Sequence, residues 1–194
     1  MKKIISLIIV FIISGCASNS LVDAEKVSDD QKGISTIFGA ISLNKAKVNI
    51  DKMAPEKYTG FKMYGEVYKD KKLVENKEVY EYKIDNYKEK DLPKYESIYT
   101  SISRNEKEKF QVNFGVEDGV GYAPIVFDKD IQAEKFKSYA QVETKVEKSK
   151  ENIVLLNAIS LNKDNETNEP SPTSNLSDLN KELNSYIVVY IQFY

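Results

Sequence analysis

The stretch that decides the fold is YIVVYIQFY, residues 186–194. It carries no charge and is apolar at every position except Gln192. Successive side chains of a strand point to opposite faces, so one face holds Ile187, Val189, Ile191 and Phe193. Because the other face is also apolar, both faces should be covered by other parts of the chain. The pattern therefore predicts a strand in the middle of a sheet.

Several other segments alternate apolar and polar residues with the period of two that is typical of half-buried strands. These segments are residues 61–68, 79–84, 98–103, 110–117, 120–127 and 136–146. Residues 153–156 are apolar on both faces, and residues 43–50 alternate after a stretch, 34–41, whose spacing also fits a helix. Seven to nine strands with little helix predict an all-β fold, either an antiparallel β-sandwich or a small barrel.

Turn signals separate these segments. Asp118-Gly119 is the strongest of them, because a two-residue hairpin turn needs positive φ at both positions. Asp70-Lys71-Lys72 is a second predicted turn, and residues 162–177 form a long polar loop. Ser177-Asp178-Leu179 can begin a short helix that continues to about Asn184.

The N-terminus has the layout of a cleavable export signal. Lys2 and Lys3 form a basic start, and an apolar run covers residues 4–13. Ten helical residues rise only about 15 Å, whereas a bilayer core needs roughly 20 residues. The next residues, Ser14-Gly15-Cys16, complete a sequence that resembles the lipobox of bacterial lipoproteins, with Ile13-Ser14-Gly15 before the cysteine. The resemblance covers about a tenth of the chain, and no family is identified for the remainder.

The lipoprotein resemblance implies diacylglycerol attachment to the Cys16 sulfur, cleavage before Cys16 and acylation of the new N-terminus. Several acyl chains, such as palmitate, would anchor the protein stably, since each buried CH₂ contributes about 0.8 kcal/mol. In such lipoproteins an aspartate after the cysteine favours the inner membrane. Ala17 stands there, which implies the outer membrane where the host has one. An ordinary signal peptide with a chance cysteine and a short interfacial anchor are the alternatives.

The chain divides into a signal peptide (1–15), a lipidated cysteine with a flexible tether (16–32) and one β-rich domain (33–194). Removing residues 1–15 from 194 leaves 179, enough for one domain with a substantial core. The mature chain then has 26 basic and 30 acidic residues, a formal charge of −4, which does not favour nucleic acid. Cys16 is the only cysteine, so an internal disulfide is excluded.

The chain contains no histidine, which excludes Ser-His-Asp and Cys-His catalysis and histidine-ligated zinc. Ala-Ile-Ser-Leu-Asn-Lys occurs at 40–45 and 158–163, so Ser-x-x-Lys appears twice, at Ser42 with Lys45 and Ser160 with Lys163. Penicillin-binding serine enzymes share this spacing but also need Ser-Asp-Asn and Lys-Thr-Gly, which are absent. Two similar strand ends explain the repeat better than catalysis does.

Acidic residues offer two weaker candidates. Asp128, Asp130, Gln132 and Glu134 recur at every second position, as calcium ligands do, but Ala133 replaces the glycine that an EF-hand loop requires. Glu117 and Asp118 are adjacent, so on a strand they point to opposite faces and do not form a paired acid and base. We therefore expect no catalytic residues, no metal site and no cofactor.

Tyrosines are the remaining candidates for contact with a partner. Tyr64, Tyr68, Tyr80 and Tyr82 could form one aromatic strip across a hairpin, as at carbohydrate and protein contact surfaces. Half-buried strand tyrosines are the ordinary alternative.

The sequence as a whole predicts a lipid-anchored cell-envelope protein whose β-domain is a binding or structural module, not an enzyme. Its expected partners are the membrane, through Cys16, and an envelope protein. A carboxylate-dependent envelope hydrolase is one alternative. An integral outer-membrane barrel is another, since Tyr194 resembles the aromatic end of such barrels. The final strand is apolar on both faces, which does not suit a polar lumen.

Overall fold

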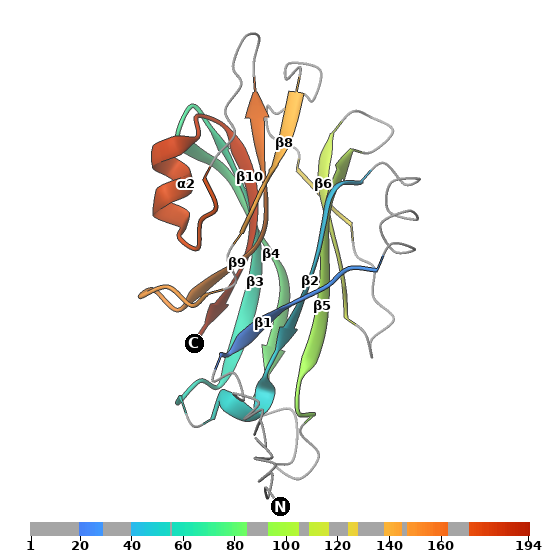
Figure 1. The fold of residues 1–194 in the computed structure, drawn as a ribbon, viewed down its shortest axis with the longest axis vertical. Helices are drawn as coiled ribbons and strands as arrows, with labels where there is room; N and C mark the ends of the chain where they lie inside the picture. Colours follow the sequence, from blue (N-terminus) through green and yellow to red (C-terminus); the bar gives the residue numbers. More distant parts are fainter. Residues whose placement is uncertain are drawn as a thin grey trace, which may run out of the picture.

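In a computed structural model the protein is a sandwich of two antiparallel sheets, which face each other across the core (Figure 1). The structure describes residues 20–28, 40–54, 56–84, 93–104, 109–116, 124–127, 138–144, 147–162 and 171–194. The all-β prediction is confirmed, and the two-sheet arrangement is the sandwich of the two predicted alternatives.

Each sheet contains five of the described strands. The first sheet has the order β1 (Val22–Glu25), β2 (Ala40–Val48), β5 (Glu96–Arg104), β6 (Phe110–Val116) and β7 (Ile125–Val126). The second has the order β4 (Lys72–Lys83), β3 (Gly60–Lys69), β10 (Tyr186–Phe193), β9 (Ile153–Asn162) and β8 (Ser138–Val142). A 3₁₀ turn, η1 (Ile50–Lys52), follows β2, and a short helix, α2 (Leu176–Glu182), lies against the outer face of the second sheet (Figure 1).

The C-terminal strand β10 lies in the middle of its sheet, as predicted. It pairs with β3 on one side and with β9 on the other. Ile187, Val189 and Ile191 are fully buried between the two sheets. On the outer face Tyr186 and Val188 are fully buried in a second cluster with Leu179 of α2. The helix thus covers the face that a two-layer sandwich would leave in water.

Two predicted hairpins can be compared with the structure. β3 and β4 are joined at Asp70-Lys71, whose φ angles of 50° and 64° are the left-handed pair that a type I′ turn requires. The Asp118-Gly119 turn lies outside the described residues. The pairs that are described, Gln111–Val126 and Val112–Ile125, have the register that this turn predicts.

Strand β4 does not pair evenly along its length. Met63 lies opposite Tyr80 and Tyr64 opposite Glu78, so Val79 is a bulge residue without a partner in the ladder. A second shift lies at Val74. A bulge residue reverses the faces of the side chains beyond it, so the simple period of two fails in this strand.

The predicted tether contains folded structure, and the prediction is wrong for residues 20–28. Val22–Glu25 is strand β1, which pairs in antiparallel fashion with β2. Leu21, Val22 and Val27 are buried, at 3%, 2% and 7% exposure. Asp23 and Glu25 alternate with apolar residues, but four residues are too few for the pattern to stand out. Burial of these apolar side chains outweighs the polar composition that suggested a mobile linker.

A reciprocal pair of asparagines links the two sheets. Asn44 of β2 donates from Nδ2 to the Leu156 carbonyl of β9 at 2.8 Å. Asn157 of β9, which is fully buried, donates from Nδ2 to the Thr100 carbonyl of β5 at 3.2 Å. The register of β9 against β10 shifts at this point. The Leu156 carbonyl lies at this irregular point of the ladder, and both side-chain amides bond to backbone carbonyls across the sandwich.

Candidate functional site

Cys16 lies outside the described residues, but the structure begins close to it. Ser20 is held by Asn49, whose side-chain Nδ2 donates to the Ser20 carbonyl at 2.9 Å. The Asn49 backbone N–H donates to the Leu21 carbonyl at 2.8 Å. Ser20, which belongs to the described part of the chain, is four residues after the candidate lipidation site. No helix in the described residues is long and apolar enough to cross a bilayer.

The two Ser-x-x-Lys copies do not form a catalytic pair. The first begins β2 and the second lies at the end of β9, as the strand-end interpretation predicted. Ser42 is 4% exposed and lies on the face of β2 that carries the core residues Ala46 and Val48. Lys45 lies on the opposite face of β2 and forms an ion pair with Glu25 at 3.2 Å. Ser160 is fully buried, and Lys163 lies outside the described residues.

Lys45 lies in an environment that keeps it charged. A hydrogen bond with Tyr99 and the neighbouring Glu25 carboxylate raise the pKa of Lys45 above its usual range, although burial opposes them. Its Nζ also lies 4.9 Å from the centre of the Tyr99 ring. A lysine that acts as a general base needs the opposite shift, so Lys45 does not suit that role.

The acidic candidates are not brought into a described site. Asp128, Asp130, Gln132 and Glu134 lie outside the described residues, as do Glu117 and Asp118. Within the residues that are described, no group of three or more histidine, cysteine, aspartate or glutamate residues could hold a metal ion.

The four tyrosines do not form one strip, and they fit the alternative of half-buried strand residues: Tyr64, Tyr68 and Tyr80 are half-buried and Tyr82 is buried. With the bulge at Val79, Tyr80 lies opposite Met63 and Tyr82 opposite Phe61, on the other face from Tyr64 and Tyr68. Tyr80 and Tyr82 point into the core, where the Tyr82 ring stacks on Phe61 with centroids 5.3 Å apart. Tyr64 and Tyr68 lie on the outer face. Tyr68 stacks on Tyr186 at 4.4 Å, and Tyr64 packs against Tyr190 at 5.4 Å.

A carboxylate–tyrosine cluster, which the sequence did not indicate, lies on this outer face. Glu66 is only 4% exposed and accepts hydrogen bonds from Tyr190 at 3.0 Å, Tyr68 at 2.9 Å and Asn76 at 2.6 Å. Burial, together with Glu66, raises the pKa of the Tyr68 and Tyr190 phenols above their usual range. Both phenols therefore stay protonated and serve as donors. The polar residues at alternate positions of β3 were the only sequence signal for this cluster.

The carboxylate–tyrosine cluster should contribute to stability. Glu66→Leu would remove the acceptor for three donors, of which the Tyr190 hydroxyl is the most deeply buried. We expect a loss of about 1–2 kcal/mol in the free energy of unfolding, measured by urea denaturation. Glu66→Gln keeps an acceptor oxygen at the same place and should cost less. Equal stability of the Leu variant and the wild type would show that the bonds do not hold the fold.

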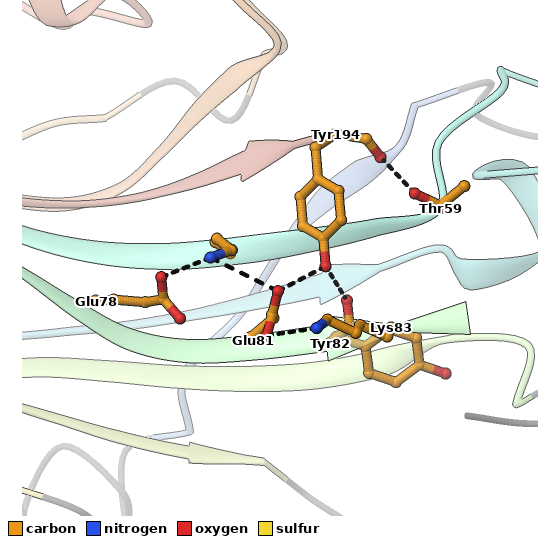
Figure 2. Close-up of polar contacts among 7 residues, drawn as sticks. Thr59, Glu78, Glu81, Tyr82, Lys83 and Tyr194 are labelled. Atoms are coloured by element: carbon orange, nitrogen blue, oxygen red, sulfur yellow. Dashed lines mark hydrogen bonds and ion pairs between the residues drawn. The ribbon is translucent and has the colours of Figure 1, made fainter. Parts of the chain in front are cut away.

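A row of alternating charges lies on the outer face of the second sheet, near the C-terminus (Figure 2). Lys62 donates to Glu78 at 2.8 Å, and Lys83 pairs with Glu81 at 3.1 Å. The Tyr194 hydroxyl donates to Glu81 at 2.9 Å. Lys83 lowers the pKa of Glu81, and burial with the Glu81 hydrogen bond raises the pKa of Tyr194 to about 12. The Glu81 carboxylate is thus kept ionised beside Lys83, and the row as a whole is an arrangement for surface pairing and not for proton transfer.

The outer face of the first sheet carries a row of hydrogen-bonded amides and hydroxyls. Asn113 donates to Ser103 at 2.9 Å and to Ser101 at 3.1 Å, and Gln111 also donates to Ser103 at 3.1 Å. The polar positions of residues 98–103 and 110–117 are what the period of two predicted. Their mutual bonding across β5 and β6 could not be predicted without the strand register.

Two small surface pockets lie in the described part of the protein. One, of about 140 Å³, lies at the seam between the two sheets and includes Glu25, Lys45 and Glu143. The other, of about 290 Å³, lies between the turn at Ser149–Glu151 and the start of α2. Small-molecule sites in proteins usually have volumes of about 300–1,000 Å³, so the pocket at the seam is well below that range and the pocket beside α2 is at its lower limit.

A scan against protein-family models, a search of curated proteins and a search of solved structures each found no match to this chain.

Proposed function

We propose that this protein is a lipid-anchored cell-envelope lipoprotein whose β-sandwich serves as a binding or structural module. The proposal is supported above all by the lipobox-like Ile13-Ser14-Gly15-Cys16, which follows a basic start and a short apolar run. A folded strand begins just after the residue that resembles a lipidation site, so the anchor would connect directly to the domain.

The arrangement of reactive groups favours a module over the alternative of a hydrolase. The described carboxylates near the sheets are paired with lysines, as are Glu78 and Glu81, or accept hydrogen bonds from tyrosines, as does Glu66. A carboxylate-dependent hydrolase would need two carboxyl groups that face one cleft with different pKa values. Glu25 and Glu143 do line one pocket, but that pocket is only about 140 Å³ and Glu25 is paired with Lys45. The partner is proposed to be another envelope component that contacts the sandwich surface.

Replacement of the candidate lipidation site provides the first test. Cys16→Ser should abolish incorporation of labelled palmitate and leave the protein unprocessed or soluble after cell fractionation. The double variant Cys16→Ser/Ser18→Cys is a matched control, because it restores a thiol outside the lipobox and should also remain unlabelled. Persistent membrane attachment of the Cys16→Ser chain would contradict the lipid anchor.

The binding role of the β-sandwich is tested separately by photo-crosslinking in intact cells. A photoreactive residue at exposed positions of the sandwich, such as Leu73 (49% exposed) or Lys72, should give a discrete adduct when it lies in a contact surface. The same positions in the Cys16→Ser chain provide the control for contacts that need the anchor. Absence of adducts over both sheets would contradict a binding role.

A further inference from the structure

Chain length limits where the domain can lie relative to a lipid on Cys16. Only three residues separate Cys16 from Ser20, so their Cα atoms are at most about 14 Å apart in a fully extended chain. Strand β3 has ten residues and extends about 30 Å along the sandwich. The reach of the connecting residues is therefore about half the length of β3.

The structure fixes Ser20 at one end of the sandwich. Asn49 donates to the carbonyls of Ser20 and Leu21, and its Nδ2 also donates to Asp23 Oδ2 at 2.8 Å. The 3₁₀ turn η1 follows Asn49, and the Asp51 N–H donates to the Lys94 carbonyl at 3.3 Å. We call the surface around these residues the Ser20 end, comprising residues 20–21, 49–54, 56–59, 93–95 and 194. The β3–β4 turn at Asp70-Lys71 lies at the opposite end (Figure 1).

Exposed aromatic residues gather at the Ser20 end. Of the three large hydrophobic residues that the structure describes as exposed, Tyr95 (45%) and Tyr194 (42%) lie there, and Leu73 lies at the opposite end. Tyr194 is tied to the Ser20 end by its carbonyl, which accepts from the Thr59 N–H at 2.8 Å. Tyrosine has an apolar ring and a polar tip, and it is enriched where proteins meet lipid headgroups.

Lysines accompany these tyrosines. Lys47 Nζ lies 4.0 Å from the centre of the Tyr95 ring, and Lys57 and Lys94 are exposed. Exposed acidic residues, Asp51 and Glu56, also lie at this end, and Glu56 is paired with Lys148. Lysine side chains next to aromatic rings suit a headgroup layer, since the stems lie along apolar surface and the ammonium groups contact phosphate.

These observations together assign an orientation, and we propose that the domain stands on the membrane with its Ser20 end against the headgroups of the leaflet that holds the Cys16 lipid. Tyr95 and Tyr194 contact the interface, and Lys47, Lys57 and Lys94 face anionic headgroups. The β3–β4 turn and α2 then point away from the membrane. This inference rests on the proposed lipidation of Cys16.

The orientation can be measured with single cysteines, because Cys16 is the only cysteine and its sulfur would be blocked by lipid. Full-length lipidated protein carrying Tyr95→Cys or Lys57→Cys is labelled with a fluorophore. It is then reconstituted in phosphatidylcholine–phosphatidylglycerol vesicles that contain a lipid with a nitroxide on its headgroup. Leu73→Cys is the matched control at the opposite end, and Glu143→Cys is the control for a domain that lies on its side.

Quenching of the fluorophore in the Tyr95→Cys and Lys57→Cys proteins should exceed that in the Leu73→Cys and Glu143→Cys proteins at least threefold. Equal quenching in all four proteins, or stronger quenching in either control, would overturn the orientation. Mass spectrometry of the same samples separates the two proposals. Absence of lipid on Cys16 would overturn both of them, whereas lipidated protein with the wrong quenching pattern would overturn the orientation alone. Melting of each labelled variant at the wild-type temperature confirms that the fold is intact.

Discussion

A chain that stops at Ser185 should fail to fold. The truncation removes β10, whose residues Ile187, Val189, Ile191 and Phe193 are buried between the sheets. Burial of each such side chain contributes about 1.5–3 kcal/mol, so the four together approach the 5–15 kcal/mol that is typical of a whole domain. The deletion would also separate β3 from β9, since β10 is the strand that joins them.

The test uses the chain without residues 1–15 and with Cys16→Ser, expressed with and without residues 186–194. The truncated chain should aggregate or show no cooperative thermal transition. Ile191→Val in the longer chain is a matched control for small changes within β10, and it should cost only about 0.5–1.5 kcal/mol and melt cooperatively. A truncated chain that melts near the temperature of the longer one would mean that β10 is peripheral.

Gly60→Ala, at the buried start of β3, should destabilise the fold strongly. A Cβ atom at Gly60 would lie 2.4 Å from the Tyr82 carbonyl oxygen and 2.5 Å from the Tyr194 hydroxyl. The Tyr194 side chain can move, but the Tyr82 carbonyl belongs to the backbone of β4. The β3–β4 ladder must therefore shift at the Gly60–Lys83 pair. We expect a loss of about 2–3 kcal/mol in the free energy of unfolding.

The same substitution in a Tyr194→Ala chain identifies which contact causes the loss of stability. In a Tyr194→Ala chain the hydroxyl is gone and only the backbone contact remains, so Gly60→Ala should still cost most of its full effect. Gly65→Ala is a useful comparison, because its Cβ would meet only side chains, the nearest being Phe127 at 3.1 Å. Urea denaturation of the wild type, the three single variants and the Gly60→Ala/Tyr194→Ala double variant measures the differences. If Gly60→Ala causes no loss of stability in the Tyr194→Ala chain, the contact with the Tyr194 ring, and not the contact with the β3–β4 ladder, is the cause of the loss.

The strands with a clear pattern could be predicted from the sequence, and β10 is the best example. Its two apolar faces predict a central position, because a strand at the edge or surface would leave one face in water. The short helix was also predicted near its observed position, Leu176–Glu182, since Ser177-Asp178 follows a polar loop. In both cases the local pattern and the tertiary packing agree.

The missed features depend on contacts between distant segments. Strand β1 was missed because only its pairing with β2 distinguishes Val22–Glu25 from a polar linker. The division of the tyrosines between two faces could not be predicted, because the bulge at Val79 depends on how β3 and β4 align, which alternation within one strand does not reveal. Glu66 gathers donors from β3, β4 and β10, so its surroundings exist only in the assembled sheet.

The uneven pairing of β4 has a consequence for crowding. A lipid anchor would confine many copies of this domain to one leaflet, where neighbouring copies collide with similar orientations. Regular edge strands in such copies would expose unpaired backbone N–H and C=O groups. These groups could join one molecule to the next in a continuous intermolecular sheet. β4 is the last described strand of its sheet, but its bulges at Val74 and Val79 interrupt the regular spacing that such growth requires. The irregular strand would thus make this edge of the sheet a poor template for joining neighbouring anchored molecules.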